Sequence, residues 1–587
     1  MPVEISAIAN CDDAVLFWKI GAKLPDCFGF AIEREQEFKN GQVKRILLHN
    51  YTGFAKDTPK EGEHRPSNVW PFQRFSWSDH SVNEGDKVRY RVVPMVHEAG
   101  QLQQLTSERS PWTEWIELSG DATDGVASYF NRGLVLSQFM ARYLEALRVR
   151  DALPNLDAAL KAFKKSLDDH ELPIRQFLSG ALRLRMLDLL AKAKSEKQHV
   201  FGALYELDDD ELVEALGKLG ARGHLVLSNG SIEKKKGEPA ETARKRDQNA
   251  KARKTLIDDG LEMHKRAISP GALGHNKFLV FTDASQNARA VWTGSTNWTK
   301  TGLCTQINNG LYVENPEFAK EYLAQWKRLR DAGSDFPDVG LVTPNSSPKP
   351  VTVGKTKTTI WFSRTRGQVD LAALDEIVNG AKQAVLFLMF QPGGAATLGT
   401  IQKRLRGPDN LYIKGVVSTL PPTTPAKKKN VEPKVTVTTF GDGQKHKPLS
   451  LDVVQPQGLR NPFAKAAEEV TRKQFLSGPG RIGFAIVHSK LIVVDPFTNP
   501  IVVTGSHNFS GAASNANDEN FVIVRNNPTL AREYAAHILS VYQHYRWRAA
   551  SQRQGTKKPP QALLVDGPDW QDRLLTGPAR REMDFWV

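Results

Sequence analysis

The sequence is poor in cysteine and has no long apolar segment. Its three cysteines, Cys11, Cys27 and Cys304, have a spacing that fits neither a disulfide framework nor a zinc site. No stretch approaches the roughly 18 uninterrupted apolar residues that a transmembrane helix needs. Residues 1–16 have no basic start and contain two aspartates, which does not fit a signal peptide. These absences predict a cytoplasmic protein.

Positive charge is what the sequence has in excess. The 587 residues carry a formal net charge of +14, and the isoelectric point is near 9.4. Such a balance favours anionic partners, either nucleic acid or an acidic membrane surface. The hydrophobic content of 40% and the charged content of 25% are ordinary for a globular protein, and the length allows several domains.

One segment gathers side chains that are suited to a phosphate. His488 and Lys490 stand two apart before an apolar, β-branched run, so a strand would place both side chains on one face. A second apolar run ends at Gly505, and a hairpin would return Ser506 and Asn508 beside that pair. An imidazole, an ammonium group and an amide at one strand end can together handle a phosphate.

The same pattern occurs a second time, earlier in the chain. His275 and Lys277 precede an apolar run, and Ser295 and Asn297 follow a second one. The two copies, each with His-x-Lys, an aspartate and Gly-Ser-x-Asn, resemble the signature of the phospholipase D superfamily, which carries it twice. The first copy departs from the pattern, because five residues rather than four separate its lysine from Asp283.

The resemblance implies a metal-independent phosphodiesterase without a cofactor, in which both copies build one site. Displacement at a phosphodiester needs a nucleophile, a proton for the leaving oxygen and cations for the phosphoryl oxygens. One imidazole can attack phosphorus while the other donates the proton, and the roles reverse when water cleaves the phosphohistidine. The family implies His275 as nucleophile and His488 as acid and base; the symmetry leaves the reverse assignment open. The phosphoryl oxygens would be held by Lys277, Lys490, Asn297 and Asn508.

Other residues of the two copies are expected to support this chemistry. Glu519 could hold the tautomer of a catalytic histidine, and Asn308, at the corresponding place in the first copy, could do so more weakly as a neutral group. In the family the motif aspartates, here Asp283 and Asp495, support the structure outside the phosphate pocket. The extra residue before Asp283 matters little if that side chain caps a turn, and more if it shifts the strand register.

The order of predicted elements indicates a multidomain protein, with an all-β sandwich followed by a duplicated α/β core with mixed sheets. Residues 1–120 contain short β-rich runs and resemble a fibronectin type III domain, which could dock a protein partner. Strand, helix and strand precede each His-x-Lys motif, which predicts two similar α/β halves. The expected ranges are 121–195 for a helical lead-in, 196–333 and 356–550 for the halves, 334–355 for a connector and 551–587 for a docked tail.

Two basic segments stand outside the repeat. Residues 233–254 hold nine lysines and arginines against four acids, and residues 421–434 include three consecutive lysines. Both segments would lie near the site if the halves pack face to face, although a charge run is as often a solvated loop. The predicted substrate contacts are Ser295, Ser506, Lys234, Lys235, Lys236, Arg244, Lys245 and Arg246.

The leading hypothesis is therefore a nuclease that cleaves DNA, with RNA as a second substrate. One alternative is a phospholipase D that acts on membrane phospholipids, but the loops before the motifs lack the exposed Trp, Phe and Leu of an interfacial enzyme. Another alternative is a nucleic-acid-binding protein with weak catalysis. The intact histidine and lysine in both copies argue against that reading.

Overall fold

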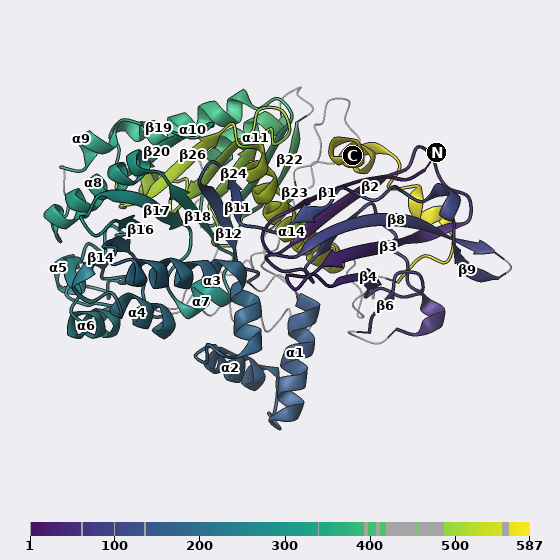
Figure 1. The fold of residues 1–587 in the computed structure, drawn as a ribbon, viewed down its shortest axis with the longest axis horizontal. Coiled ribbons are helices and arrows are strands. Elements are labelled where there is room, and N and C mark those ends of the chain that lie inside the picture. Colours follow the sequence, from purple (N-terminus) through teal and green to yellow (C-terminus); the bar gives the residue numbers. More distant parts are fainter. Residues whose placement is uncertain are drawn as a thin grey trace.

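The computed structural model describes residues 2–59, 63–98, 100–133, 137–337, 340–392, 397–406, 411–417, 452–454, 487–553 and 563–587. Within these ranges the chain forms a β-rich N-terminal domain, a core built on two eight-stranded sheets, and a projecting helical hairpin (Figure 1). The second basic segment, residues 421–434, lies outside the described residues.

The N-terminal domain contains a three-stranded sheet and a five-stranded sheet, so the predicted β-rich region is confirmed. In the first half of the longest strand, β8, buried and accessible side chains alternate, because successive residues point to opposite faces. The resemblance to fibronectin type III stays a prediction. The strands are β1 (Glu4–Ala9), β2 (Ala14–Lys19) and β7 (Ser76–Asp79) in one sheet, β3 (Cys27–Glu37), β4 (Val43–Leu47), β8 (Lys87–Glu98), β9 (Gln101–Gln104) and β10 (Ile116–Glu117) in the other, and the short pair β5 (His49–Asn50) and β6 (Arg65–Pro66).

The first sheet of the core has the order β11-β12-β18-β17-β16-β13-β14-β15. Strands β13, β14 and β15 are parallel and the remaining neighbours are antiparallel, so the sheet is mixed as predicted. Its strands are β11 (Asp121–Thr123), β12 (Val126–Phe130), β13 (Val200–Leu204), β14 (Gly223–Ser228), β15 (Glu262–Arg266), β16 (Lys277–Thr282), β17 (Ala288–Gly294) and β18 (Asn309–Glu314).

The second sheet repeats this order strand for strand, as β19-β20-β26-β25-β24-β21-β22-β23. Strands β21, β22 and β23 are parallel, and the others are antiparallel to their neighbours. The duplication of the sequence motif is therefore a duplication of the whole sheet. The strands are β19 (Lys349–Val353), β20 (Thr356–Phe362), β21 (Ala384–Met389), β22 (Tyr412–Val417), β23 (Asp452–Val454), β24 (Leu491–Val494), β25 (Ile501–Gly505) and β26 (Asn520–Arg525).

Helices cover these sheets and connect the domains. The helix that ends the second half, α14, packs against strands of both core sheets and against β1 of the N-terminal domain (Figure 1). Among the described residues, no helix combines the length and the apolar content of a membrane span. The helices are α1 (Ser137–Arg150), α2 (Leu156–Ser166), α3 (Pro173–Ser195), α4 (Asp210–Gly217), α5 (Ala240–Arg244), α6 (Ala250–Asp258), α7 (Lys300–Cys304), α8 (Pro316–Ala332), α9 (Val342–Asn345), α10 (Val369–Gly380), α11 (Thr397–Arg406), α13 (Gly511–Asn515), α14 (Pro528–Arg553) and α15 (Gly577–Trp586).

Two asparagines at strand starts hold the two halves together through matching contacts. In the first half, Asn309 Nδ2 donates to Thr504 Oγ1 at 2.7 Å and to the Tyr534 hydroxyl at 3.2 Å. In the second half, Asn520 Oδ1 accepts from Thr293 Oγ1 at 2.8 Å and from the hydroxyl of Tyr322 at 3.1 Å. All these groups are buried, so each asparagine side chain satisfies polar groups of the opposite half. The halves therefore pack in a fixed, pseudo-symmetric orientation.

Two predicted segments contain strands that belong to the core sheets. The expected helical lead-in, residues 121–195, begins with β11 and β12, which extend the first sheet. The expected connector, residues 334–355, ends with β19, the corresponding edge strand of the second sheet. These three strands are short or follow turn-forming residues, so their local pattern resembles a loop, and pairing with the sheet is what makes them strands.

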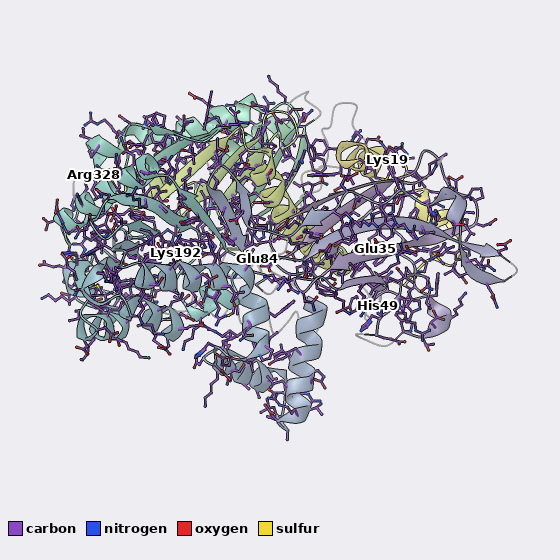
Figure 2. The ribbon with its side chains drawn as sticks, viewed as in Figure 1. Lys19, Glu35, His49, Glu84, Lys192 and Arg328 are labelled. Atoms are coloured by element: carbon purple, nitrogen blue, oxygen red, sulfur yellow. The ribbon has the colours of Figure 1, made fainter. Side chains whose placement is uncertain are left out.

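The C-terminal tail lies against the N-terminal domain. The Trp570 ring packs edge-on against Phe30, and its Nε1 donates to the carbonyl of Cys27 at 2.9 Å. At the end of α15, Trp586 stacks on Phe17 with ring centroids 4.7 Å apart. Glu84, labelled in Figure 2 where the sandwich meets the core, has a raised pKa because it is buried and faces Asp12. The tail and this junction join the first domain to the core.

Candidate active site

The two His-x-Lys motifs meet at the interface between the halves. His275 and His488 are both buried, and their ring centroids are 6.3 Å apart with the planes at 73°. Backbone pairing holds this arrangement, because the amides of His488 and Ser489 both donate to the carbonyl of Ile307 in the first half. The two motifs therefore lie together at one place between the halves.

A lysine and an aromatic ring accompany each histidine. Lys277 Nζ donates to the carbonyl of His275 at 2.8 Å and lies 4.9 Å from the ring centre of Tyr205, which directly follows β13. In the second half Lys490 Nζ donates to the carbonyl of His488 and lies 5.1 Å from the ring of Phe390, which follows β21. The ring face stabilises a cation that burial would otherwise destabilise. The two aromatic residues were not among the residues predicted from the sequence.

The Gly-Ser-x-Asn turns bring each asparagine to the same place, and the glycine is required there. A Cβ atom at Gly294 would lie 2.3 Å from the carbonyl oxygen of Asn309, and one at Gly505 would lie 2.3 Å from that of Asn520. The backbone amide of Asn508 donates to the carboxylate of Glu519, and the Oδ1 atoms of Asn297 and Asn508 are both buried without a hydrogen-bond partner among the described residues.

The hydroxyl groups of the motif serines, Ser295 and Ser506, take part in internal hydrogen bonds. The Ser295 hydroxyl donates to Asn308 Oδ1 at 2.8 Å, and the Ser506 hydroxyl accepts from the amide of Asn520 at 3.0 Å. Both serines are fully buried in these contacts. These hydrogen bonds connect each turn to the following strand. The position of the serines therefore does not favour direct contact with a substrate.

Each histidine is held by a residue of the opposite half. Glu519 Oε1 lies 3.0 Å from His275 Nδ1, and the same carboxylate accepts from the amide of Asn508 and from Asn517 Nδ2. Asn308 Oδ1 lies 2.9 Å from His488 Nδ1. Both contacts involve Nδ1, so the Nε2 atom of each ring is left for chemistry.

The amide orientation of Asn308 fixes the tautomer of His488. Its Nδ2 donates to the carbonyl of Gly302 at 2.9 Å, so the oxygen faces His488 and the Ser295 hydroxyl. An amide oxygen only accepts, so Nδ1 of His488 carries a proton. The prediction that Glu519 and Asn308 occupy equivalent places behind the histidines agrees with this geometry, and each acts across the interface.

Sequence reasoning missed a second carboxylate at the site. Glu206 follows Tyr205 at the end of β13, and its Oε2 accepts from Asn297 Nδ2 at 2.6 Å. The Trp298 amide donates to the Glu206 carbonyl at 3.1 Å, and this hydrogen bond connects the segment after β13 to the turn after β17. A glutamate after an apolar strand is common, so only its place in the first repeat could have drawn attention to it.

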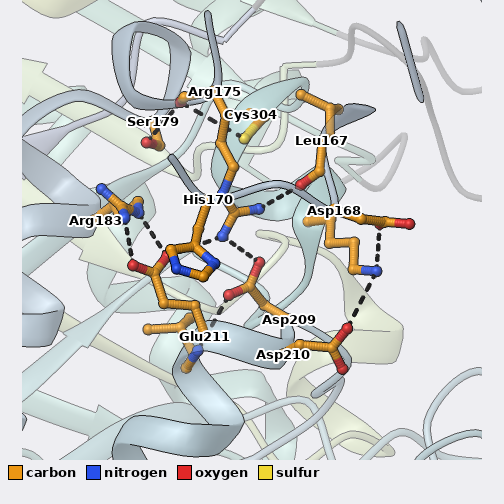
Figure 3. A network of polar contacts seen from close by, with 12 residues as sticks. Leu167, Asp168, His170, Arg175, Ser179, Arg183, Asp209, Asp210, Glu211 and Cys304 are labelled. Atoms are coloured by element: carbon orange, nitrogen blue, oxygen red, sulfur yellow. Dashed lines mark hydrogen bonds and ion pairs between the residues drawn. The ribbon is translucent and has the colours of Figure 1, made fainter. Parts of the chain in front are cut away.

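A buried ion network fixes the loop that follows Glu206 (Figure 3). Arg175 on α3 contacts Asp209 Oδ2 at 2.9 Å and Glu211 Oε2 at 3.0 Å, and it donates to the carbonyl of Leu167. Arg183 on the same helix pairs with Glu211 as well. The projecting helices are thereby connected to the start of α4, directly beside the site.

Burial and mutual repulsion lower the pKa values of the basic groups. Burial, together with Lys277, lowers the pKa of His275 to about 4, and burial lowers the pKa of Lys277 itself to about 7. The pKa values of His488 and Lys490 are also well below their ordinary values for the same reasons. Burial alone would raise the pKa of Glu519, but the adjacent His275 outweighs it and holds that pKa at about 2.

These pKa shifts predict that anion binding takes up protons. A phosphate or tungstate ion favours the charged forms of Lys277, Lys490 and the two histidines, so it raises their pKa values. Affinity should therefore increase as the pH falls from about 8 to 6, because binding is linked to protonation. Calorimetry in two buffers of different ionisation enthalpy measures this uptake. Binding that releases protons, or exchanges none, would contradict the electrostatic description.

The motif aspartates lie outside the site, as the resemblance implied. Asp495 accepts from the backbone amides of Lys382, Gln383 and Ala384, before β21. Asp283 accepts from the amide of Asn287 and closes the turn between β16 and β17, where the pairing has a register shift. The extra residue of the first copy is therefore absorbed at a turn.

Part of the first basic segment borders the site. Gln248, inside the segment, hydrogen-bonds to Glu206, and Ser231, two residues before the segment, hydrogen-bonds to the side chain of Tyr205. The side chains of Lys234, Lys235, Lys236 and Lys245 are exposed.

The arginines of the segment have internal partners. Arg246 pairs with Glu238 at 2.6 Å and donates to the carbonyl of Glu233, so it stabilises the segment itself. The Arg244 guanidinium lies 5.1 Å from the ring of Phe336. The exposed lysines are therefore better placed than the arginines to meet a substrate.

The chain is similar to one protein family and to a few known proteins. Residues 186–330 and 435–542 match the family described as cardiolipin synthase, PLD-like domain. An uncharacterized protein of Acanthamoeba polyphaga mimivirus is 42% identical over 57 residues, which are 9% of this chain and 20% of that protein. The chain thus spans a fifth of the length of this curated relative.

Solved structures with a related chain arrangement include two of bacterial origin. The phosphatidylserine synthase of Haemophilus influenzae Rd KW20 has a TM-score of 0.39 and 12% identity, covering 70% of this chain and 94% of that one. Nuc of Salmonella typhimurium, described as a phospholipase D family member, has a TM-score of 0.21 and 19% identity, covering 27% and 91%.

Proposed function

We propose that the chain, whose residues 186–330 and 435–542 match a PLD-like domain, is a phosphodiesterase of the phospholipase D superfamily that acts on nucleic acid. The observation that carries this proposal is the convergence of His275, Lys277, His488 and Lys490 in one buried site between the halves. Two imidazoles and two cations at one place are the groups that displacement at a phosphodiester requires.

The contacts behind the histidines favour one division of labour. Nε2 of His275 attacks phosphorus, and the leaving oxygen takes a proton from Nε2 of His488 as its bond to phosphorus breaks. The positive charge that His275 gains is compensated by Glu519, 3.0 Å from its Nδ1. His488 is backed by the neutral Asn308, so its imidazolium is less stabilised and gives up its proton more readily.

The second step returns the site to its starting state. Water attacks phosphorus, His488 accepts its proton, and the bond between phosphorus and His275 breaks to give a phosphomonoester. Lys277 and Lys490 stabilise the phosphoryl oxygens in both steps, with Asn297 and Asn508 as hydrogen-bonding partners. The two lysines supply the positive charge at the phosphoryl group, and no described group of His, Cys, Asp or Glu is arranged to hold a metal ion.

Exposed lysines beside the site support a nucleic acid rather than a lipid as substrate. Residues 234–236 are accessible and hydrophilic, which suits a phosphate backbone contacted through charge. We expect the purified protein to cleave DNA in the presence of EDTA, and RNA as a second substrate. DNA, RNA and phospholipid vesicles should be incubated in parallel, with and without the chelator. Headgroup release with every nucleic acid intact would identify a phospholipase, and loss of cleavage in EDTA would contradict the metal-independent mechanism.

Neutralising the exposed lysines should weaken substrate binding more than catalysis. The triple variant Lys234→Gln, Lys235→Gln, Lys236→Gln removes phosphate contacts, so KM for DNA should rise about tenfold at physiological salt while kcat changes less than about twofold. The slope of log affinity against log salt should become shallower by about two to three units. A matched control replaces three exposed lysines of the N-terminal domain, Lys39, Lys44 and Lys87, by glutamine. If both triple variants changed KM and the salt dependence equally, residues 234–236 would have no local role in substrate binding.

A further inference from the structure

Glu206 is an unusual group in this site, because it adds a negative charge where a phosphate would bind. It is buried, its carboxylate accepts from Asn297 Nδ2 at 2.6 Å, and Gln248 hydrogen-bonds to it as well. The charges that act on it are those of Lys277, Lys490 and Asp208. The two lysines are the cations expected to hold the phosphoryl group, so Glu206 and a bound phosphate would share them.

The position of this carboxylate is fixed by the backbone. The Trp298 amide donates to the Glu206 carbonyl, and the amides of Asp208 and Asp209 donate to the Trp298 carbonyl at 3.1 and 3.2 Å. Asp209 is in turn held by the buried guanidinium of Arg175. These contacts fix the backbone of Glu206, and the hydrogen bond from Asn297 Nδ2 holds its carboxylate, so a ligand meets the carboxylate where it stands.

In the described part of the second half, the corresponding place carries no charge. By the matching of β13 with β21, and of Tyr205 with Phe390 over the lysines, Gln391 takes the place that corresponds to Glu206. Gln391 is exposed whereas Glu206 is buried, so the first half encloses a carboxylate where the second half exposes an amide. The asymmetry therefore points to a role in ligand binding.

We propose that Glu206 is a specificity-determining residue that makes the site favour a monoanionic phosphodiester over dianionic phosphoryl groups, such as a terminal phosphomonoester. The inference rests on the proposed function, since it assigns the charge of that function's substrate. Coulomb energy is proportional to the product of the two charges, so the same carboxylate repels a dianion twice as strongly as a monoanion.

The same repulsion helps the product to leave. Hydrolysis of the phosphodiester by water gives an alcohol and a phosphomonoester, and the monoester loses a further proton near neutral pH to become a dianion. The carboxylate is then beside a group of higher charge than the one that bound. Burial raises the pKa of Glu206 to about 7, so the group is ionised in mildly alkaline solution.

The test compares a dianion with a monoanion in binding experiments that need no catalysis. Calorimetry at pH 8.5 gives the Kd of sulfate and of dimethyl phosphate for the full-length wild type and for Glu206→Gln. If the variant binds dimethyl phosphate about threefold more tightly, it should bind sulfate about tenfold more tightly, because the dianion gains twice the energy. The variant Asp208→Asn removes a nearby exposed carboxylate and should change the ratio of the two Kd values by less than about twofold.

The reverse change provides a second measurement if Glu206→Gln folds poorly. Gln391→Glu adds a carboxylate at the corresponding place, so it should weaken sulfate binding more than dimethyl phosphate binding. An unchanged ratio of Kd values in both variants would overturn the inference. If the wild type hydrolyses its substrate but the ratio of Kd values is unchanged in the variants, only this inference is refuted. If the ratio changes but no hydrolysis occurs, the proposed function is refuted and the anion selectivity stands.

Discussion

Replacing His275 by alanine should lower kcat by about 10⁴-fold or more and prevent any covalent adduct with the substrate. His275 is the histidine whose Nδ1 contacts a carboxylate, so its loss removes the nucleophile as the mechanism assigns it. His488→Ala should behave differently, because it keeps the nucleophile and loses the proton donor. It should attack a substrate with a good leaving group and then accumulate the adduct, since no base activates the water.

Single-turnover kinetics on a p-nitrophenyl ester of a nucleotide separate these two variants. A burst of p-nitrophenol without further turnover is the expected signature of His488→Ala. The control is His264→Ala, which alters a partly exposed histidine on the edge strand β15 and should leave kcat within about twofold of the wild type. A burst from His275→Ala, with none from His488→Ala, would reverse the assignment.

Replacing Glu519 by glutamine should lower kcat by about a hundredfold with little change in KM. The carboxylate compensates the positive charge that His275 acquires when it bonds to phosphorus, and an amide does so only weakly. Asn308→Ala removes a neutral partner of His488 and should cost about tenfold. An amide at position 519 can still accept from the backbone amide of Asn508, so the fold should be retained.

The pH dependence of these variants distinguishes a role in chemistry from a role in folding. The carboxylate of Glu519 raises the pKa of His275 against the effect of burial, so Glu519→Gln should lower that pKa below its value of about 4. The acid limb of kcat/KM, where His275 becomes protonated, should then move to lower pH. A uniform loss of activity at every pH, with a lower melting temperature, would mean that Glu519 serves the fold alone.

The sequence motifs predicted much of this site because they repeat. His-x-Lys before an apolar run, and Gly-Ser-x-Asn after the next one, determine the hairpin and the face on which the side chains lie. The equivalence of Asn308 with Glu519 also followed from the alignment of the two copies. Which half each of them serves did not follow, because that depends on the packing of two sheets against each other.

What the sequence did not predict depends on contacts between distant residues. Tyr205 and Glu206 follow a strand whose sequence is typical of any buried strand. Only the pairing of that strand with β16 places them near Lys277. Similarly, β11 and β19 are short edge strands and β12 is a short strand beside β11, and their assignment needs a partner. The inter-half contacts of Asn309 and Asn520 became visible only when both halves were assembled.

The most direct test of the shared site is to identify the residue that carries the adduct. The wild type and His488→Ala should be mixed with a DNA oligonucleotide, denatured in alkali after short times, and digested for mass spectrometry. Alkaline conditions are chosen because phosphohistidine is stable in base and labile in acid. The account predicts a nucleotide attached to the peptide that contains His275, in larger amount in the variant. A nucleotide on the His488 peptide, or cleavage of DNA with no adduct at any time, would contradict it.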